Sequence, residues 1–327
     1  MEYLILFPVM LSFFLTLIIL PKWIKKAHEI GLKWKDCNKN KEVYVAGSGG
    51  IIVLFVFVIS TLLYVAIKTF YFKTTENVIE ILALLTSILL LGMTGLIDDL
   101  LGWHRKGLSK RIRIFLCIIS AIPLMVINIK NGYGFFYLLF IVPIGITGCA
   151  TTFNFLAGMN GLEARQGILL LGALAIASYF TNVRWVSLIA LTMISSLIAF
   201  LFYNKYPAKI FPGDILTYSV GGLIAIIAIL SRLEKFALFI FIPYFIEVFL
   251  KLRGNLEKQS FGKPKKDNSL DLLYDKIYSL NHLAIILLKK IKPSKKVYER
   301  DVVLAINIFQ IIIIIIAFII FRNHIFG

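Results

Sequence analysis

Long apolar stretches alternate with polar segments along the whole chain. The apolar stretches cover residues 3–20, 49–67, 78–97, 112–129, 135–150, 167–181, 185–202, 215–231, 236–250 and 302–321. About 20 apolar residues in a helix cross the roughly 30 Å core of a bilayer, and shorter stretches cross with little tilt or where the bilayer thins. The pattern therefore predicts an all-α integral membrane protein, a single polytopic domain over residues 1–327 with about ten transmembrane helices.

The composition supports a membrane protein over a soluble one. Hydrophobic residues make up 59% of the chain, and the mean hydropathy is +0.86. Ordinary soluble domains are roughly 45–50% apolar, and one core cannot hold the excess. The net charge of +17 is by itself typical of nucleic-acid-binding proteins. Here the cations fall between apolar stretches, so we expect the lipid bilayer as a partner and no nucleic acid.

Lysine and arginine are shared unequally between the two sides that these stretches define. The connections after the first, third, fifth, seventh and ninth stretches hold 28 of the 35 Lys and Arg residues, 13 of them in the long basic connection 251–301. Positively charged connections stay in the cytoplasm. We therefore expect both termini outside, and an active site on the cytoplasmic face, where the connections are also rich in Gly, Asn and Asp.

Two adjacent carboxylates, Asp98 and Asp99, end the third apolar stretch. The C-terminus of a helix already carries partial negative charge, so a positive group must offset them. The candidates are a divalent metal or the basic residues that follow, which are His104, Arg105, Lys106, Lys110, Arg111 and Arg113. A solvated helix end is the simpler alternative, but ionisable groups at a membrane boundary are more often functional.

The connection between the fifth and sixth stretches carries the sequence N-F-L-A-G-M-N-G-L-E-A, beginning at Asn154. Gly158 and Gly161 allow tight turns and close approach of a ligand to the backbone. Asn160 with Glu163 also fits the start of a helix that resembles a capping box. That structural explanation leaves Asn154 unexplained in a run that is otherwise apolar enough to be buried.

Two short motifs precede the inner ends of other helices. Phe211 to Asp214 reads F-P-G-D, where Asp214 suits a helix start and Phe211 suits either packing or stacking on a base. Residues 46–50 read A-G-S-G-G, a weak signal because glycines are common where a loop joins a helix. Mg²⁺ prefers oxygen ligands that it shares with substrate phosphates, so three acids, two amides and many cations on one face favour phosphoryl transfer.

The long connection 251–301 is the most basic segment of the inner face. It contains Arg253, Lys258, Lys263, Lys265 and Lys266. A basic loop beside a bilayer most often attracts anionic lipid. The same side chains also suit a diphosphate, and both interpretations stay open.

In order and kind, these motifs resemble those of the polyprenyl-phosphate N-acetylhexosamine-1-phosphate transferases (glycosyltransferase 4 family). The resemblance extends over nearly the whole chain, and its most specific part is the stretch that begins at Asn154. That stretch and the Phe211–Asp214 motif are similar to the archaeal and eukaryotic branch, which makes N-acetylglucosaminyl-diphosphodolichol for protein N-glycosylation. The bacterial cell-wall branches typically carry an Asp where Ala157 or Gly158 stands here.

The resemblance implies a reaction and its substrates. Dolichyl (polyprenyl) phosphate would attack the β-phosphate of UDP-N-acetylglucosamine, with Mg²⁺ as cofactor and UMP as the leaving product. A second copy of the chain, in a homodimer, is a further candidate partner. The resemblance leaves open whether a carboxylate acts as general base or the lipid phosphate attacks directly.

The resemblance also implies roles for individual residues. It assigns catalysis to Asp98, Asp99 and Asp214, and Mg²⁺ binding to Asn154 and Asp214. It assigns nucleotide binding to Gly50, Gly158, Asn160 and Phe211, and phosphate binding to Lys110, Arg111 and Arg113. Glu163, Lys263 and Lys265 are weaker candidates for the sugar and diphosphate.

Two departures from the family pattern limit these roles. Thr151 stands where the family has an Asn, and Arg113 is the nearest match to the family's Lys after the Asp pair. Arg and Lys bind phosphate differently. The His- and Arg-rich sugar-recognition segment of the eukaryotic enzymes also has no clear copy in the last loop, so the resemblance specifies the reaction but not the sugar.

Other functions stay open from the sequence. One is a transferase for another UDP-N-acetylhexosamine, of the muramic-acid type, and another is a non-catalytic lipid-binding subunit. A transporter would place ionisable residues near the bilayer midplane, but Glu247, the obvious acid within a stretch, lies near its inner end. The short basic connections and modest length favour a multi-pass protein of an archaeal, prokaryotic cell membrane over the endoplasmic reticulum.

Overall fold

Helices form most of the protein, as predicted from the apolar pattern. The computed structural model describes residues 2–104, 106–129 and 134–327. Its helices are η1 (Glu2–Leu6), α1 (Phe7–Glu29), α2 (Gly50–Ala66), η2 (Ile67–Tyr71), α3 (Val78–His104), α4 (Lys110–Ile119), α5 (Ile122–Ile129), η3 (Tyr137–Ile141), α6 (Val142–Phe153), α7 (Leu162–Phe180), α8 (Arg184–Asn204), α9 (Asp214–Leu230), α10 (Glu234–Ile240), α11 (Ile242–Arg253), α12 (Leu280–Ile291), α13 (Glu299–Ile320) and α14 (Arg322–Phe326).

Among the described residues, five helical segments are long and apolar enough to cross a membrane. They are Leu4–Glu29, Gly50–Tyr71, Val78–Trp103, Arg184–Asn204 and Glu299–Ile320, while Tyr137–Phe153 and Asp214–Leu230 are shorter apolar helices. The predicted stretches 112–129 and 236–250 are each divided into two helices. Both second halves begin next to a proline, Pro123 and Pro243, which lacks the N–H that would continue the preceding helix.

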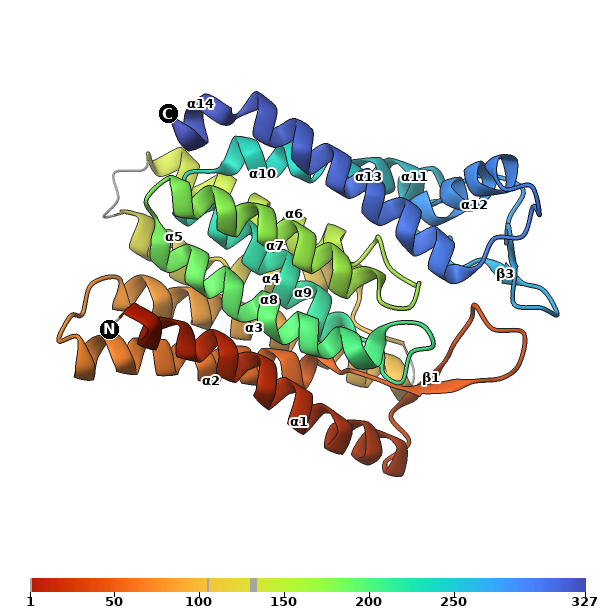
Figure 1. The fold of residues 1–327 in the computed structure, drawn as a ribbon, viewed down its shortest axis with the longest axis horizontal. Helices are drawn as coiled ribbons and strands as arrows, with labels where there is room; N and C mark the ends of the chain where they lie inside the picture. Colours follow the sequence, from red (N-terminus) through yellow and green to blue (C-terminus); the bar gives the residue numbers. More distant parts are fainter. Residues whose placement is uncertain (1, 105, 130–133) are drawn as a thin grey trace.

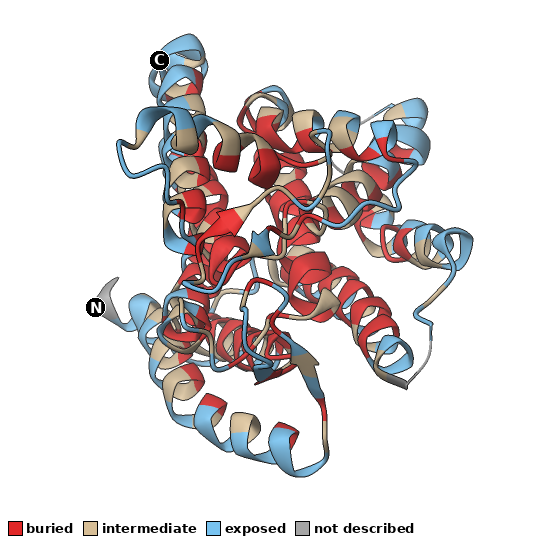
Figure 2. Cartoon of the chain, turned by 90° about the vertical axis from the view of Figure 1, so that its right-hand side faces the viewer, coloured by how far each residue is buried: buried red, intermediate tan, exposed pale blue. Residues whose placement is uncertain are grey.

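Helix α9 runs through the centre of the bundle. It packs against α2, α3, α6, α7 and α8, and all but its two end residues are buried. Gly221 and Gly222 allow this packing, because a Cβ at either position would collide with α6 or α3. Figure 2 shows the buried residues gathered at the centre of the bundle, with exposed residues around them. The N-terminus of α9 and the C-terminal part of α3 consequently lie side by side.

Two short hairpins correct the all-α prediction. Strand β1 (Lys33–Lys35) pairs antiparallel with β2 (Tyr44–Ala46), and β3 (Lys263–Pro264) pairs antiparallel with β4 (Leu270–Asp271). Ala46 also bridges to Ile210, which ties the first hairpin to the segment before Phe211. These strands are only two or three residues long, too short for the alternating pattern that reveals a strand in a sequence.

Both chain termini lie at one end of the bundle, and both hairpins and α12 lie at the other end (Figure 1). This arrangement is expected when a chain crosses a layer an even number of times. The polar segments that the sequence places on one face are therefore gathered at the hairpin end.

Candidate active site

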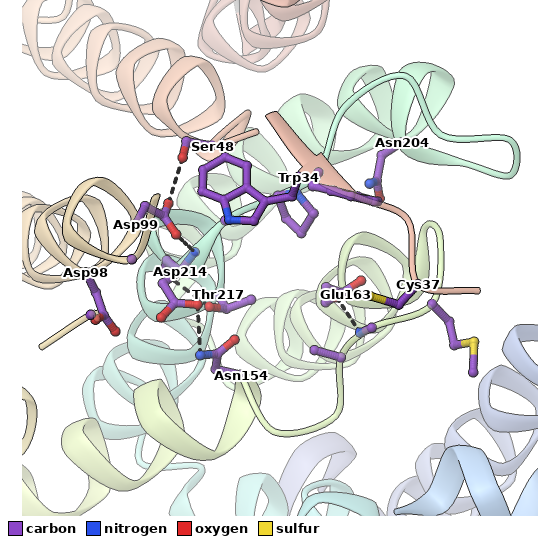
Figure 3. A pocket seen from close by; sticks show the side chains of 18 of the residues that line it. Trp34, Cys37, Ser48, Asp98, Asp99, Asn154, Glu163, Asn204, Asp214 and Thr217 are labelled. Carbon is purple, nitrogen blue, oxygen red and sulfur yellow. Dashed lines mark hydrogen bonds between the residues drawn. The ribbon is translucent and has the colours of Figure 1, made fainter. Parts of the chain in front are cut away.

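A cavity of about 520 Å³ opens at the hairpin end, where α3 ends and α9 begins. Figure 3 shows carboxylate and amide side chains from α3, α6 and α9 pointing toward one another in it. The cavity is lined by most of the residues that the sequence singled out, which are Asp98, Asp99, Arg113, Asn154, Gly158, Asn160, Glu163, Phe211 and Asp214. Segments more than 100 residues apart in the chain thus form one site.

Asp99 caps the N-terminus of α9 from outside that helix. Its Oδ1 accepts a hydrogen bond from the backbone N–H of Asp214 at 2.7 Å, and its Oδ2 accepts one from Ser48 Oγ at 3.0 Å. A carboxylate is favoured there by the partial positive charge of the helix terminus. Gly213, with φ of 74°, makes the contact possible, because a Cβ at this position would overlap the Asp99 carboxylate. Asp99 therefore positions the start of α9.

Asp98 has a different set of partners. Its Oδ1 accepts the backbone N–H of Leu108 at 2.6 Å, and its Oδ2 lies 2.6 Å from Arg113 Nη2. Asp98 is buried and Arg113 is partly exposed. The sequence predicted that a metal or one of the following basic residues offsets the Asp pair. Among the described residues, Arg113 is the basic residue that pairs with it. Arg105, another candidate, lies outside the described residues.

Asp214 begins α9 and faces Asn154 at the end of α6. The Asn154 amide Nδ2 donates to Asp214 Oδ1 at 3.0 Å (Figure 3). The carboxyl groups of Asp98 and Asp99 line the same cavity as Asp214. Two neighbouring carboxylates repel each other unless a proton or a cation lies between them.

A divalent cation fits this arrangement by charge and by ligand type. Arg113 pairs with Asp98, and among the described residues no ion pair joins Asp99 or Asp214 to a cation. Among described residues, no group of three or more His, Cys, Asp or Glu side chains is arranged to hold a metal. Mg²⁺ commonly takes one or two protein carboxylates together with water and substrate phosphates, and the oxygens of Asp214 and Asn154 suit that mode.

A buried ion cluster holds the loop between α6 and α7 from the side of the first hairpin. Lys39 Nζ lies 3.3 Å from Asp36 Oδ2 and also contacts Glu299 at the start of α13. Asn160 donates from Nδ2 to Asp36 at 3.1 Å and from its backbone N–H to Glu299 at 2.5 Å. We call these four residues the Lys39 clamp. All four are buried or nearly so.

Further hydrogen bonds fix the same loop to the last connection. Asn38 Nδ2 donates to the Gly158 carbonyl at 2.6 Å, while its Oδ1 accepts the N–H of Gly262 at 3.0 Å. Glu163 Oε1 accepts the N–H of Gly158 at 3.0 Å, and Asn281 donates to the Ala157 carbonyl at 3.0 Å. The connection 251–301 thus packs directly on the site.

Several lining residues were not singled out from the sequence. They are Trp34, Lys35, Asp36, Cys37, Ser48, Gly102, Gly107, Ala157, Met159, Asn204, Pro212, Gly213, Thr217 and Phe261. Asp36 belongs to the polar run D-C-N-K after the first helix, but polar residues are ordinary in a loop, so the run did not mark Asp36 as a site residue. Desolvation and the neighbouring Asp36 raise the pKa of the Cys37 thiol, which disfavours its thiolate form.

Five predicted residues lie away from this cavity. Gly50 packs against Leu216 inside the bundle, and Lys110 and Arg111 are exposed at the start of α4. Lys263 lines a separate cavity, and Lys265 pairs with Asp271 at 2.8 Å. The structure brings Arg113, alone of the three predicted phosphate-binding residues, to the cavity wall. Lys110 precedes Arg113 by about one turn on α4, so both lie toward one face of that helix, but Lys110 is at its exposed start.

The comparisons with known proteins identify the family of the chain. The sequence model described as glycosyl transferase family 4 matches residues 81–232. A protein of Saccharolobus solfataricus is 36% identical over 297 residues, which cover 86% of this chain and 88% of that protein. The chain belongs to glycosyl transferase family 4. Asp98, Asp99, Asn154 and Asp214 all lie within the matched residues.

The names of such relatives describe one reaction type. The Saccharolobus protein has the provisional name UDP-N-acetylglucosamine–dolichyl-phosphate N-acetylglucosaminephosphotransferase. A Dictyostelium discoideum protein with the same name, without the provisional qualifier, is 28% identical over 278 residues, 70% of this chain and 67% of its own length. A phospho-N-acetylmuramoyl-pentapeptide-transferase of Halalkalibacterium halodurans is 26% identical over 258 residues, 72% of this chain and 77% of its own length.

Proposed function

We propose that this member of glycosyl transferase family 4 transfers N-acetylglucosamine-1-phosphate from UDP-N-acetylglucosamine to dolichyl (polyprenyl) phosphate. The products are UMP and N-acetylglucosaminyl-diphospho-lipid, the first lipid-linked intermediate for protein N-glycosylation. The observation that carries the proposal is the convergence of Asp98, Asp214, Asn154 and Arg113 on one cavity at the hairpin end of an apolar bundle. Relatives that bear this enzyme name support it over most of the chain.

The polar residues of the cavity would bind and orient the diphosphate. Asp214 and Asn154 would hold Mg²⁺, which supplies positive charge to the diphosphate oxygens. Arg113, fixed by its ion pair with Asp98, presents guanidinium donors to a phosphate oxygen. In phosphoryl transfer most of the catalysis comes from such positioning and charge neutralisation.

The lipid phosphate is the nucleophile that the site favours. Both oxygens of Asp99 accept hydrogen bonds at the start of α9, and Asp98 is paired with Arg113. Both carboxylates are thus engaged in holding other groups of the protein, which favours a positioning role for them over that of a base. A phosphate monoester has a second pKa near 6 and is largely dianionic at neutral pH. A lipid phosphate oxygen thus forms the new bond to the β-phosphorus, and the bond from that phosphorus to the UMP oxygen breaks.

The uridine would lie between Phe211 and the loop that begins at Ala157. Phe211 lines the cavity and offers a ring on which a base can stack. Asn160 Nδ2 donates to Asp36, so its Oδ1 is the atom left to accept the N3–H of uracil. Gly158, with φ of 96°, keeps the backbone close to the base. The Lys39 clamp would therefore act as a positioning device for nucleotide binding.

The distribution of charge supports an inward-facing site. We infer about ten crossings, both termini outside, and the cavity at the cytoplasmic surface of an archaeal cell membrane. The termini lie at the end opposite the cavity, and the basic connection 251–301 packs beside it (Figure 1). Under this proposal residues 1–327 act as one domain.

A muramic-acid-type transferase is the second candidate, because one relative bears that name. A transporter is disfavoured by Glu247. Its Oε2 accepts the backbone N–H of Leu280 at 2.7 Å and the hydroxyl of Ser279 at 3.2 Å. This acid thus caps α12 and does not line a path through the bundle.

A lipid-product assay tests the proposal. Purified protein, polyprenyl phosphate, Mg²⁺ and radiolabelled UDP-N-acetylglucosamine should give a labelled organic-soluble lipid and one equivalent of UMP. UDP-N-acetylgalactosamine and UDP-N-acetylmuramoyl-pentapeptide, each run in parallel, should give much less product. A product from the muramoyl substrate alone would support the second candidate. No lipid product from any of the three would contradict phosphoglycosyl transfer altogether.

A further inference from the structure

A second groove lies at the same end of the bundle but shares no residue with the active-site cavity. It has a volume of about 560 Å³ and is formed by the starts of α7 and α13 and the segment after α8. Its lining residues are Arg165, Lys205, Tyr206, Arg300, Leu304 and Asn307. Nothing in the proposed reaction uses this groove.

The groove is lined by three cations and by no acid. The ion pairs found among the described residues join none of Arg165, Lys205 and Arg300 to a carboxylate. Arg300 and Arg165 lie on the wall of the same groove. Like charges held close together are unfavourable until an anion offsets them.

Two donors of the groove, on Arg300 and Asn307, are held in place by neighbouring residues. The Arg300 guanidinium lies over the Tyr206 ring, 4.7 Å from its centroid, and donates to the Tyr206 carbonyl at 3.3 Å. The Gln166 amide donates to Asn307 Oδ1 at 2.9 Å, so the Asn307 amide nitrogen is left as a donor. Three cations and an amide donor around one space suit the oxygens of a phosphate group.

An apolar stripe continues from this groove along α13. Leu304, Ile308, Ile311 and Ile315 follow at spacings of three or four residues, and all four are exposed. Residues at these spacings share one face of a helix. A phosphate group in the groove would therefore have an apolar track directly beside it, as a membrane lipid requires.

We propose that this groove binds an anionic membrane lipid, with the headgroup phosphate held by Arg165, Lys205 and Arg300 and a hydrocarbon chain along Leu304 to Ile315. Basic pockets between helices at the cytoplasmic side of a membrane bind such headgroups. Tyr206 links the groove to the active site, because its other partner is Lys39, whose Nζ lies 4.1 Å from the ring centroid. A bound lipid would thus also steady the Lys39 clamp.

Native mass spectrometry of the purified full chain tests this proposal. The protein in neutral detergent is titrated with phosphatidylglycerol, with phosphatidylcholine of the same chains, and with inorganic phosphate. Wild type should retain one phosphatidylglycerol at concentrations where phosphatidylcholine and phosphate leave it unbound. Arg165→Gln/Arg300→Gln should bind phosphatidylglycerol about 30-fold more weakly, since each cation near an anionic surface contributes about fivefold.

Two further variants make the result specific to the groove. Lys22→Gln/Lys25→Gln removes two exposed cations from α1 and should leave the affinity unchanged. Lys205→Gln changes one exposed side chain and should weaken binding about fivefold, even if the double arginine variant does not fold. The proposal would be overturned if phosphatidylcholine or inorganic phosphate bound as tightly as phosphatidylglycerol. It would also be overturned if Lys205→Gln bound phosphatidylglycerol with unchanged affinity.

Discussion

The Lys39 clamp is the feature whose loss should separate nucleotide binding from chemistry. Lys39 is 9% exposed, and its two carboxylate partners Asp36 and Glu299 are 3% and 2% exposed. Lys39→Met keeps the length of the side chain but removes the charge. It leaves two acids buried together with no cation. Breaking a buried ion pair by removing one partner costs about 3–5 kcal/mol, so the variant should unfold at a clearly lower temperature than wild type.

Part of the free energy lost with the ion pair should also weaken the binding of the substrate. Asn160 is held by both carboxylates, and it belongs to the loop proposed to contact uracil. A loosened loop must be ordered again when the nucleotide binds. A full 3 kcal/mol corresponds to about 150-fold in affinity. Because some of the loss is spread over the fold, we expect the KM for UDP-N-acetylglucosamine to rise at least about tenfold, and kcat to fall much less.

A double-mutant cycle provides the decisive measurement. Glu299→Gln removes one negative charge but keeps an Oε1 that can accept the Asn160 N–H. The loss of unfolding free energy in Lys39→Met/Glu299→Gln should therefore be smaller than the sum of the losses in the two single variants, by more than about 0.5 kcal/mol. Lys41 is an exposed residue on the same loop, so Lys41→Met should have the stability and the KM of wild type. Additive losses in the cycle, or an unchanged KM in folded Lys39→Met, would refute the clamp as a positioning device.

Three other changes test the catalytic assignments. Asp214→Asn removes a proposed Mg²⁺ ligand, so lipid product should fall below detection while the melting temperature stays within a few degrees; near-normal turnover would contradict the metal assignment. Chelation of divalent ions should abolish product formation, and added Mg²⁺, but not Na⁺, should restore it. Gly213→Ala places a Cβ against the Asp99 carboxylate at a positive φ, which costs of order 1–3 kcal/mol, so turnover should drop sharply. Gly134→Ala has open space around its Cβ, so its turnover should equal that of wild type.

The sequence predicted the helical character of the bundle and the side on which its polar residues gather. Apolar runs as long as 78–97 admit no other regular structure in a bilayer. The breaks near Pro123 and Pro243 were less visible, because the runs around them stay apolar. Short hairpins such as β1–β2 depend on contacts with distant segments, here Ile210, and leave almost no local signal.

The candidate site was predictable where polar residues had no structural reason to be present. Asn154 and Asp98 stood out in this way and both line the cavity. Asp36 and Lys39 did not stand out, since polar residues in a cytoplasmic loop are ordinary. Their importance comes from Glu299, which lies 260 residues from Lys39 in the chain. Only the tertiary structure brings these three side chains together.

The adjacent acids Asp98 and Asp99 show how one helix can serve two neighbours. Successive side chains on an α-helix point about 100° apart. Asp99 is thereby directed to the N-terminus of α9 and to Ser48, while Asp98 is directed to Arg113 on α4.

Each acid is thus engaged by a different element, and each holds in place a group that we propose acts on the substrate. Asp99 contacts the backbone N–H of Asp214, and Asp98 pairs with Arg113. If this division is correct, Asp99→Asn should retain measurable turnover, because an amide oxygen still accepts the Asp214 N–H. A general base at this position would lose all activity on the same change. Turnover of Asp99→Asn with a pH profile parallel to wild type would support direct attack by the lipid phosphate, and complete loss in a folded variant would contradict it.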